Sequence, residues 1–412
     1  MASQDGSSGA PQLERQKAFG PVKARQPHLL WLQKQVCGGD EGLFKPYAGL
    51  EKAAWEDKQT FVQWKSEAEF QRVVHPIRMR QKTIVLQPLV HSTPLPGYPL
   101  KVVEQPVMEH LQRFCQAFFS GMEVTLAEPL DMATLKNLTS RVHALTNRTQ
   151  FLVPDLLKHL KSRRPRRAYC VVGVTLFDLY PSPEWNFVMG HALLTEGCAV
   201  FSFGRHFNPE QAVCGGESTL LVQLKHLWVL MRVMTHEICH VMGMKHCYYY
   251  HCAMNESNSI DEAVSQPLFL CPICLRKLHK ALKFDVLQHY ISLRERCQEL
   301  LLVSSPLSVP SPPDGGVHAT PPSPPKNLPA LESDQSAPLD SAHSPPSLDH
   351  THSSPSLDPA HSSPSLDHTH SSPSQGATQS THPTPTEPSV TSQFQQSLNW
   401  LDECLHSLMS FI

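Results

Sequence analysis

The sequence predicts a domain that mixes α-helices with β-strands, then a disordered segment, then one more helix at the C-terminal end. Three observations carry this prediction. Patterns typical of helix and of strand alternate between residues 104 and 242. Residues 304–393 are rich in Pro and contain no Phe, Trp or Tyr, which is typical of disorder. An apolar seam with helical spacing returns after residue 393.

Residues 1–94 are expected to form an N-terminal extension that is partly helical. Residues 1–28 are polar and are expected to be loose, and the beginning lacks the apolar stretch of a secretory signal. We therefore expect an intracellular protein, in the cytoplasm or the nucleus. Helical packing is predicted further along by five large apolar residues, Trp55, Phe61, Trp64, Phe70 and Val73.

Helix and strand patterns begin to alternate at residue 104. An amphipathic stripe predicts a helix at 104–120, and a short strand is predicted at 123–126. Two more helices are predicted at 131–145 and 154–160. The basic residues within 161–167 are expected to lie in a solvated loop, with a contact to phosphate or to an acidic partner as the alternative.

Three buried elements are predicted in the second half of the domain. Residues 169–177 are rich in β-branched side chains and predict a central strand, and 199–203 predict a shorter one. Residues 220–242 predict a long helix. Its apolar window is interrupted by charged residues and is shorter than the ~18 residues of a membrane-spanning helix, so no membrane partner is expected.

The segment 304–393 is expected to be a disordered, low-complexity tail. It holds eight acidic residues and one Lys, a net charge of −7, and cannot bury enough apolar surface to offset its ordering entropy. The string Ser-Pro-Ser-Leu-Asp starts at Ser354 and again at Ser363. We expect a flexible tether whose Ser-Pro sites can be phosphorylated, with weak metal capture by its His residues as the alternative.

Residues 394–412 are predicted to form a C-terminal amphipathic helix. Its apolar residues recur at steps of four and three, at Phe394, Leu398, Leu401, Leu405, Leu408 and Ile412. A helix this short is only marginally stable alone, so it needs a surface to cover. Docking on the preceding domain and binding to a partner protein both remain open.

The charge balance argues against a charged polymer as partner. The whole chain carries −2 and the tail −7, which leaves +5 on the rest, too little to predict binding to nucleic acid or to an anionic membrane. The linker between Cys252 and Cys271 is acidic, which also opposes phosphate contacts. In a reducing compartment, the twelve cysteines suggest metal ligands or free thiols before disulfides.

The string HEICHVMGMKH predicts a metal site. His236 and His240 are four residues apart on the predicted helix, so both imidazoles project from one face. Gly243 can take a positive φ and end the helix, which lets His246 supply a third ligand. Three neutral histidines would leave zinc its full charge and lower the pKa of a bound water to about 7. Glu237 would act as the general base.

Four cysteines predict a second, structural zinc site. Cys247 and Cys252 are followed after eighteen residues by the pair Cys271 and Cys274, and four thiolates from two short turns fill a tetrahedral sphere. Four free thiols, or a redox pair, are the alternative. The nearby Cys239 is expected to be ordinary packing. His251 is expected to be exposed, and Met254, without a special role, would be a core residue.

At these residues the sequence resembles the metzincin metallopeptidases, and among them the archaemetzincin family. The resemblance rests on HExxHxxGxxH, on Cys247-x₄-Cys252-x-Met254 and on Cys271-x₂-Cys274, and spans roughly Pro99 to Leu300. It implies the ligand set His236, His240 and His246, Glu237 as base, and a Cys₄ zinc. It also implies that Met254 is the methionine of the Met-turn beneath the catalytic metal. The Pro-rich tail is similar to that of the longer vertebrate form.

The resemblance implies an α+β fold of the metzincin type, with a mixed sheet and an active-site helix above the cleft. We therefore place a catalytic domain with two zinc sites at 95–303. Residues 199–203 should form the edge strand that pairs with an extended peptide.

Two functions are compatible with these residues. The first is a zinc metallopeptidase that hydrolyses peptides or small proteins, with aminopeptidase action as one option. The second is a catalytically weak, zinc-stabilised peptide-binding or scaffold protein. Intact Glu237 favours the enzyme, because a retired site has no physical need for the base.

Overall fold

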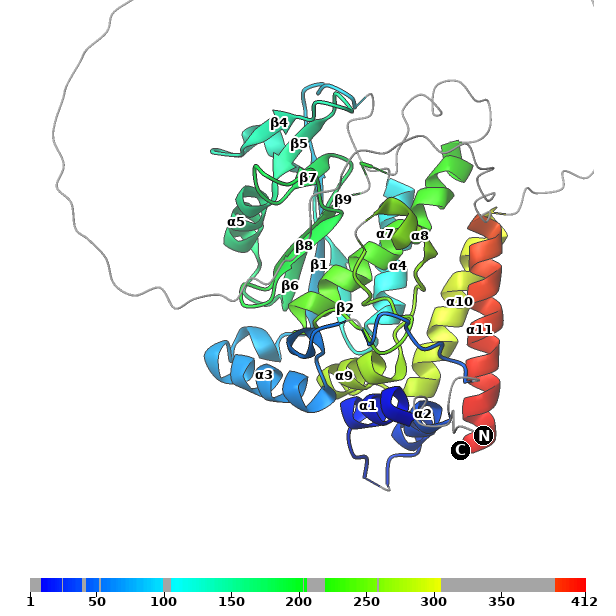
Figure 1. Ribbon diagram of the computed structural model, residues 1–412. Coiled ribbons are helices and arrows are strands. Elements are labelled where there is room, and N and C mark those ends of the chain that lie inside the picture. The colour runs from blue at the N-terminus through cyan, green and yellow to red at the C-terminus, as the bar shows by residue number, and fades with distance from the viewer. Residues whose placement is uncertain are drawn as a thin grey trace, which may run out of the picture. The chain divides into compact units, whose positions relative to one another are not determined.

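Parallel strands form the centre of the main sheet (Figure 1). Its order is β2-β1-β6-β9-β8, and β3 pairs with β1. The strands β2, β1, β6 and β9 run parallel to one another, whereas β8 is antiparallel to β9. Their bounds are β1 Thr83–Val90, β2 Glu123–Leu126, β3 Leu130–Asp131, β6 Cys170–Thr175, β8 Gly190–Leu193 and β9 Cys198–Ser202.

The computed structural model describes nine stretches of the chain. They are 9–23, 25–38, 42–51, 53–98, 105–202, 204–205, 219–257, 259–304 and 390–412. These stretches all fall in one compact unit, made of residues 1–307 and 387–412. Most of the tail predicted at 304–393, residues 305–389, lies outside the described residues.

The strand β1 was missed by the sequence analysis, although it pairs with both β2 and β6. It lies before residue 95, in the segment expected to be an extension. Pro88 explains the miss, because a proline has no backbone N–H to donate and argues against a central strand. Here Pro88 lies opposite Val174 of β6, near the end of the strand.

The prediction of the edge strand was wrong. Residues 199–203 were expected at the rim, but β9 lies between β6 and β8. The outer strand is β8, which the chain forms just before β9 through a reversal at Gly197, whose φ is 65°. Because β8 is only four residues long and its side chains are partly exposed, its sequence gave no clear strand pattern.

The helix predicted at 131–145 is wrong. That region contains a 3₁₀ turn, Met132–Thr134, and the strand β4, Ser140–Val142. Asn137 has a φ of 57°, which interrupts a right-handed helix, and Leu145 is 92 % exposed, so the apparent apolar stripe faces no core. A small second sheet forms instead, in the order β4-β5-β7, with β5 Thr149–Leu152 and β7 Asp178–Tyr180.

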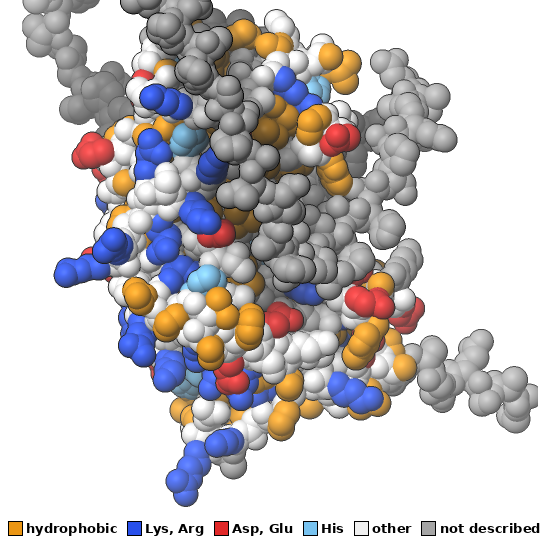
Figure 2. Space-filling model, turned by 90° about the vertical axis from the view of Figure 1, so that its left-hand side faces the viewer, with side chains coloured by type: hydrophobic (Ala, Val, Ile, Leu, Met, Phe, Trp, Pro, Cys, Tyr) orange, Lys and Arg blue, Asp and Glu red, His pale blue; other side chains and the backbone are white. Residues whose placement is uncertain are grey.

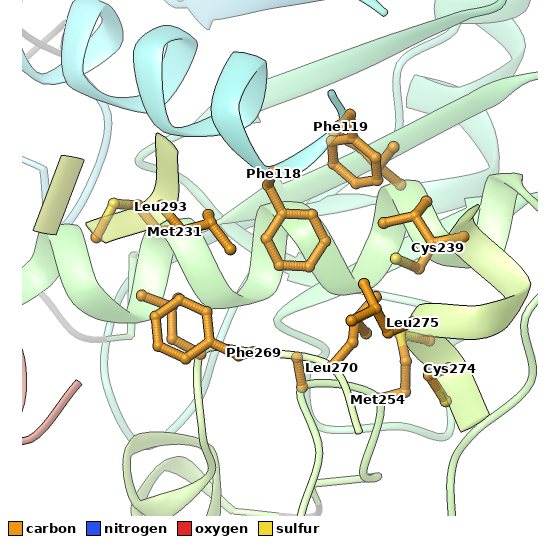
Figure 3. Packing of buried hydrophobic residues seen from close by; sticks show 14 of the residues in the cluster. Phe118, Phe119, Met231, Cys239, Met254, Phe269, Leu270, Cys274, Leu275 and Leu293 are labelled. Carbon is orange, nitrogen blue, oxygen red and sulfur yellow. The ribbon is translucent and has the colours of Figure 1, made fainter. Parts of the chain in front are cut away.

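Helices cover both faces of the main sheet, and each face has its own apolar core (Figure 1). The helices α4, Gln105–Phe118, and α7, Thr219–Val241, pack on one face, and α5, Val153–Arg163, packs on the other. Figure 3 shows the larger core, where Phe118 from α4 and Met231 from α7 belong to one buried cluster. These helices confirm the predictions made for 104–120, 154–160 and 220–242.

The N-terminal segment is more ordered than expected. Helix α1, Gly9–Phe19, lies within the part expected to be loose, and helix α2, Pro27–Cys37, begins where that part ends. Helix α3, Phe61–Val74, follows a 3₁₀ turn at Trp55–Asp57. Only Phe61 and Trp64 of the five predicted apolar residues are buried, and these two place α3 against the rest of the domain.

The last helix docks on the domain, which answers the question left open by its sequence. Helix α11, Val390–Phe411, packs along α10, Val286–Ser304, and begins before the expected Phe394. Leu401 and Leu408 are fully buried. The indole of Trp400 stacks on Phe269 at 5.0 Å between ring centroids. In the sequence, two shorter helices come between α7 and α10: α8, Ile260–Ser265, and α9, Pro272–Leu282.

No helix in the described stretches is both long and apolar enough to cross a membrane.

Candidate metal centres

Three histidines converge at the C-terminal end of α7. His236 and His240 project from the same face of the helix, and one ring nitrogen from each of these and from His246 lies within 4.8 Å of the others. The helix ends at Gly243, whose φ of 86° is accessible to glycine at little cost. The chain then turns back, and Met244 N–H donates to the Cys239 carbonyl at 3.1 Å.

The tautomers of His236 and His240 are set by backbone carbonyls. Nδ1 of His236 donates to the Ala253 oxygen at 2.7 Å, and Nδ1 of His240 donates to the Met244 oxygen at 2.6 Å. In this assignment both Nε2 atoms carry lone pairs, yet they lie 2.9 Å apart. Two facing lone pairs repel unless a cation lies between them, so this donor set fits a metal ion.

The surroundings of the three imidazoles favour their neutral form. Burial lowers the pKa of His236 well below its usual value, and it lowers the pKa of His240 to about 3. Burial also lowers the pKa of His246, with Glu256 acting in the opposite direction. Neutral imidazole is the form that binds a metal.

Glu237 is buried between α7 and the edge strand. A Cβ added to Gly190 of β8 would lie 2.5 Å from its Oε1, so the carboxylate occupies the space above a residue that has no side chain. Burial raises the pKa of Glu237 to about 8, and the positive charge of Arg232 opposes this rise. A carboxyl whose pKa lies near neutrality can both accept and release a proton.

Two residues of the N-terminal segment hold the turn that carries His246. Gln59 Nε2 donates to the Gly243 carbonyl at 2.9 Å, and the Trp64 indole donates to the Met242 carbonyl at 3.0 Å. Gln59 Oε1 also accepts from the Lys245 N–H at 3.1 Å and from the Lys277 ammonium at 3.0 Å. Gln59 was not predicted from the sequence, because no local pattern links it to a turn far along the chain.

The four predicted cysteines form a second cluster, whose first member, Cys247, directly follows His246 in the chain. Their sulfur atoms lie within 4.8 Å of one another, all four residues are buried, and Cys247 Sγ lies 3.7 Å from Cys271 Sγ. The described cysteines form no disulfide. Hydrogen bonds from the other three thiols lower the pKa of Cys247, so one thiolate is favoured even without a metal.

Asn255 organises the loop that joins the two clusters. Its amide donates to the carbonyls of Cys247 and Tyr250 at 2.6 and 2.9 Å, and its Oδ1 accepts from the Cys252 N–H at 2.7 Å. Arg232 on α7 donates to the Asn255 carbonyl at 3.3 Å. Neither residue was predicted from the sequence, since a single Asn or Arg gives no distinctive local signal.

Three residues close to the clusters in the sequence differ in burial. Cys239 and Met254 are fully buried in the larger core, as Figure 3 shows, and His251 is exposed. The Met254 carbonyl accepts from the Cys247 N–H at 2.8 Å.

Comparison with known proteins identifies the part of the chain that contains both clusters. The sequence model of peptidase family M54 matches residues 97–280. We refer to these matched residues as the M54 region. Every histidine and cysteine of the two clusters lies in this M54 region, whereas Gln59 and Trp64 precede it.

Relatives of the M54 region carry the archaemetzincin name. Human archaemetzincin-2 is 34% identical over 47% of this chain and 59% of its own length. Archaemetzincin-1 from Rattus norvegicus is 34% identical over 52% of this chain and 45% of its own length. The chain thus spans about half the length of the curated relatives it matches.

Solved archaemetzincin structures also align with the chain. The one from Archaeoglobus fulgidus, complexed with malonate, is 24% identical, with a TM-score of 0.34, and covers 47% of this chain and 99% of its own. The one from Methanopyrus kandleri is 21% identical, with a TM-score of 0.36, and covers 50% of this chain and 97% of its own.

Proposed function

We propose that this protein is a zinc metallopeptidase of the metzincin type. The observation that carries the proposal is the convergence of three histidine nitrogens within 4.8 Å, next to the buried carboxylate of Glu237. The match of residues 97–280 to the sequence model of peptidase family M54 supports the same activity. A peptidase acts on peptides or small proteins, which agrees with the expected substrate class.

The proposed roles follow from the positions of the side chains. His236, His240 and His246 would hold the catalytic zinc through their ring nitrogens. When bound, zinc supplies a Lewis acid that polarises a carbonyl and makes a water ligand acidic. Glu237 would accept the proton of the attacking water at its carboxylate and pass it to the leaving amine. The carbonyls of Ala253 and Met244 would keep two imidazoles in the ligand tautomer.

The Cys cluster would hold a second zinc with a structural role. Four thiolates leave no open coordination position and reduce the positive charge of the ion, which makes it a poor Lewis acid. All four cysteines are buried, which restricts the access of a substrate. Such a centre would tie α9 to the loop that follows the third histidine.

An extended peptide would reach the site along β8. This strand is the outer one of the main sheet in the described part of the chain, so its outer backbone groups can pair with a further strand. Its first residue, Gly190, lies against Glu237, which would bring the peptide backbone next to the general base.

The domain arrangement that we propose follows from the packing. A catalytic unit would include β1 and the N-terminal helices as well as residues 95–303, because β1 pairs inside the main sheet. The tail at 304–393 would be a flexible tether. The helix that follows it, α11, packs against α10.

Glu237→Gln tests the function, with metal content and cleavage of a peptide library measured side by side. The enzyme predicts the same zinc content in both proteins and cleavage by the wild type alone. The second hypothesis, a peptide-binding or scaffold protein without efficient catalysis, predicts equal background cleavage in both. The position of Glu237 against the edge strand favours the enzyme.

A further inference from the structure

A cavity lies on the other face of the edge strand, between β8 and α5. Its volume is about 280 Å³. Its walls are largely apolar and come from Val153, Pro154, Leu157, Pro181 and Leu193. It thus has the size and lining of a pocket for a single large side chain.

The alternation of side chains along β8 links this cavity to the candidate active site. Gly190 pairs with Phe201 and Ala192 with Ala199, and both partners belong to the core under α7. Leu193, in contrast, packs against the core under α5, and both His191 and Leu193 line the cavity. A peptide strand added beside β8 follows the same alternation, so every second side chain would point toward the cavity.

The charged groups at the cavity give it a positive bias. The Lys161 ammonium is paired with Glu196 at 2.7 Å, so these two charges largely offset each other. Lys158 also lines the cavity, is exposed and has no ion pair among the described residues. The first turn of α5, at Val153 and Pro154, adds the positive end of a helix dipole.

Positive charge also predominates on the wider surface around the cavity. Figure 2 faces the side on which α3 and α5 lie in Figure 1, and Lys and Arg side chains are more numerous there than Asp and Glu. An acidic peptide would therefore be attracted toward this side, and a basic one would be disfavoured.

We propose that the β8–α5 cavity is a specificity pocket for a glutamate side chain of the substrate. The apolar walls would take its methylene groups, and Lys158 would pair with its carboxylate. Since Gly190 lies against Glu237, the selected residue would be a near neighbour of the cleaved bond. The proposal rests on the proposed peptidase function, because it assumes a peptide that pairs with β8.

Peptide retention tests the pocket without turnover. Zinc-loaded, immobilised Glu237→Gln protein is incubated with short randomised peptides, and the retained peptides are sequenced by mass spectrometry. We expect one position at which Glu is enriched about 3- to 5-fold over Gln, the size of a partly exposed ion pair. Adding Lys158→Glu should abolish this enrichment and favour Lys at the same position.

Lys17→Glu is the matched control, because it makes the same charge change at an exposed lysine of α1 that does not line the cavity. It should leave the enrichment intact. Equal retention of Glu and Gln, a preference for Leu, or an unchanged preference in Lys158→Glu would overturn the pocket.

Wild-type cleavage of the same library separates the two proposals. Retention that selects Glu, together with an inactive wild type, would sink the peptidase and leave the pocket standing. Cleavage without any selection of Glu would sink the pocket alone.

Discussion

Gln59 donates its side-chain amide to the carbonyl oxygen of Gly243 at 2.9 Å, across 184 positions of the chain. This bond ties the segment before α3 to the turn that reverses the chain after His240. Trp64 makes a parallel bond to the Met242 carbonyl, and both side chains are almost completely buried. The geometry of the third histidine thus depends on residues outside the M54 region.

Gln59→Leu is expected to weaken metal binding at the histidines. The Gly243 carbonyl and the Lys245 N–H would lose their partner, which frees the turn that carries His246. We expect about a 10-fold loss of zinc affinity at the histidine site, in the range found for groups that orient metal ligands. Chelator competition measures it, and affinity at the cysteines, measured while the histidine site is empty, should not change. Gln395→Leu, an exposed glutamine of α11, is the control and should bind normally.

Gly190→Ala is expected to inactivate the protein while leaving its metal in place. The new methyl group would lie 2.5 Å from Glu237 Oε1 and 2.7 Å from its Cγ, so the carboxylate must move. A displacement near 1 Å typically costs about 100-fold in rate. Steady-state cleavage together with zinc analysis checks this outcome. In Gly38→Ala the added atom meets only a backbone oxygen at 3.3 Å, and that variant should retain activity.

His289→Phe is expected to reduce the sensitivity of the fold to acid. His289 is buried between Phe284 and Phe118, and burial lowers its pKa to about 3. The unfolded chain binds a proton below about pH 6.5 and the folded one does not, so folding loses stability as the pH falls below 6.5. This difference amounts to about 2 kcal/mol at pH 5.

Urea unfolding of both proteins at pH 7.5 and pH 5 measures the effect. The wild type should lose more stability than His289→Phe over this interval. An equal loss in both would contradict a neutral, buried His289. The same comparison for His406→Phe, at an exposed position of α11, should show no such difference.

Cys274→Ser is expected to remove the proposed structural zinc and to destabilise the fold. The cysteine cluster joins α9 to the loop 247–255, and binding of a structural zinc contributes directly to folding. We expect the zinc content to fall by one ion and the melting temperature to fall by several degrees, measured by atomic absorption and calorimetry. Cys297→Ser, a buried cysteine outside the cluster, should keep all the zinc.

The residues of both clusters could be selected from the sequence because their spacing is local. His236 and His240 are four positions apart on one helix. A short loop joins Cys247 to Cys252, and the first turn of α9 joins Cys271 to Cys274. In each case the backbone geometry of a few residues decides where the side chains point. The helices at 104–120 and 220–242 were equally accessible, because each buries a face over several turns.

What the sequence could not supply depends on distant partners. The strand β1 contains Pro88 and is defined by pairing with β6, more than eighty residues away. The edge of the main sheet is β8 and not the predicted β9, because the order of strands in a sheet is not encoded in any local pattern. Gln59 is an ordinary polar residue until Gly243 lies beside it.

The loop 247–255 has a thermodynamic consequence. Its Ala253 carbonyl orients His236, and the adjacent Cys252 belongs to the other cluster. When one ion binds and orders this loop, the other ion no longer has to meet the entropic cost of ordering it. The two zinc affinities should therefore be linked, and by reciprocity each should rise by the same factor when the other site is filled. Zinc bound at one cluster would then favour the loading of the other.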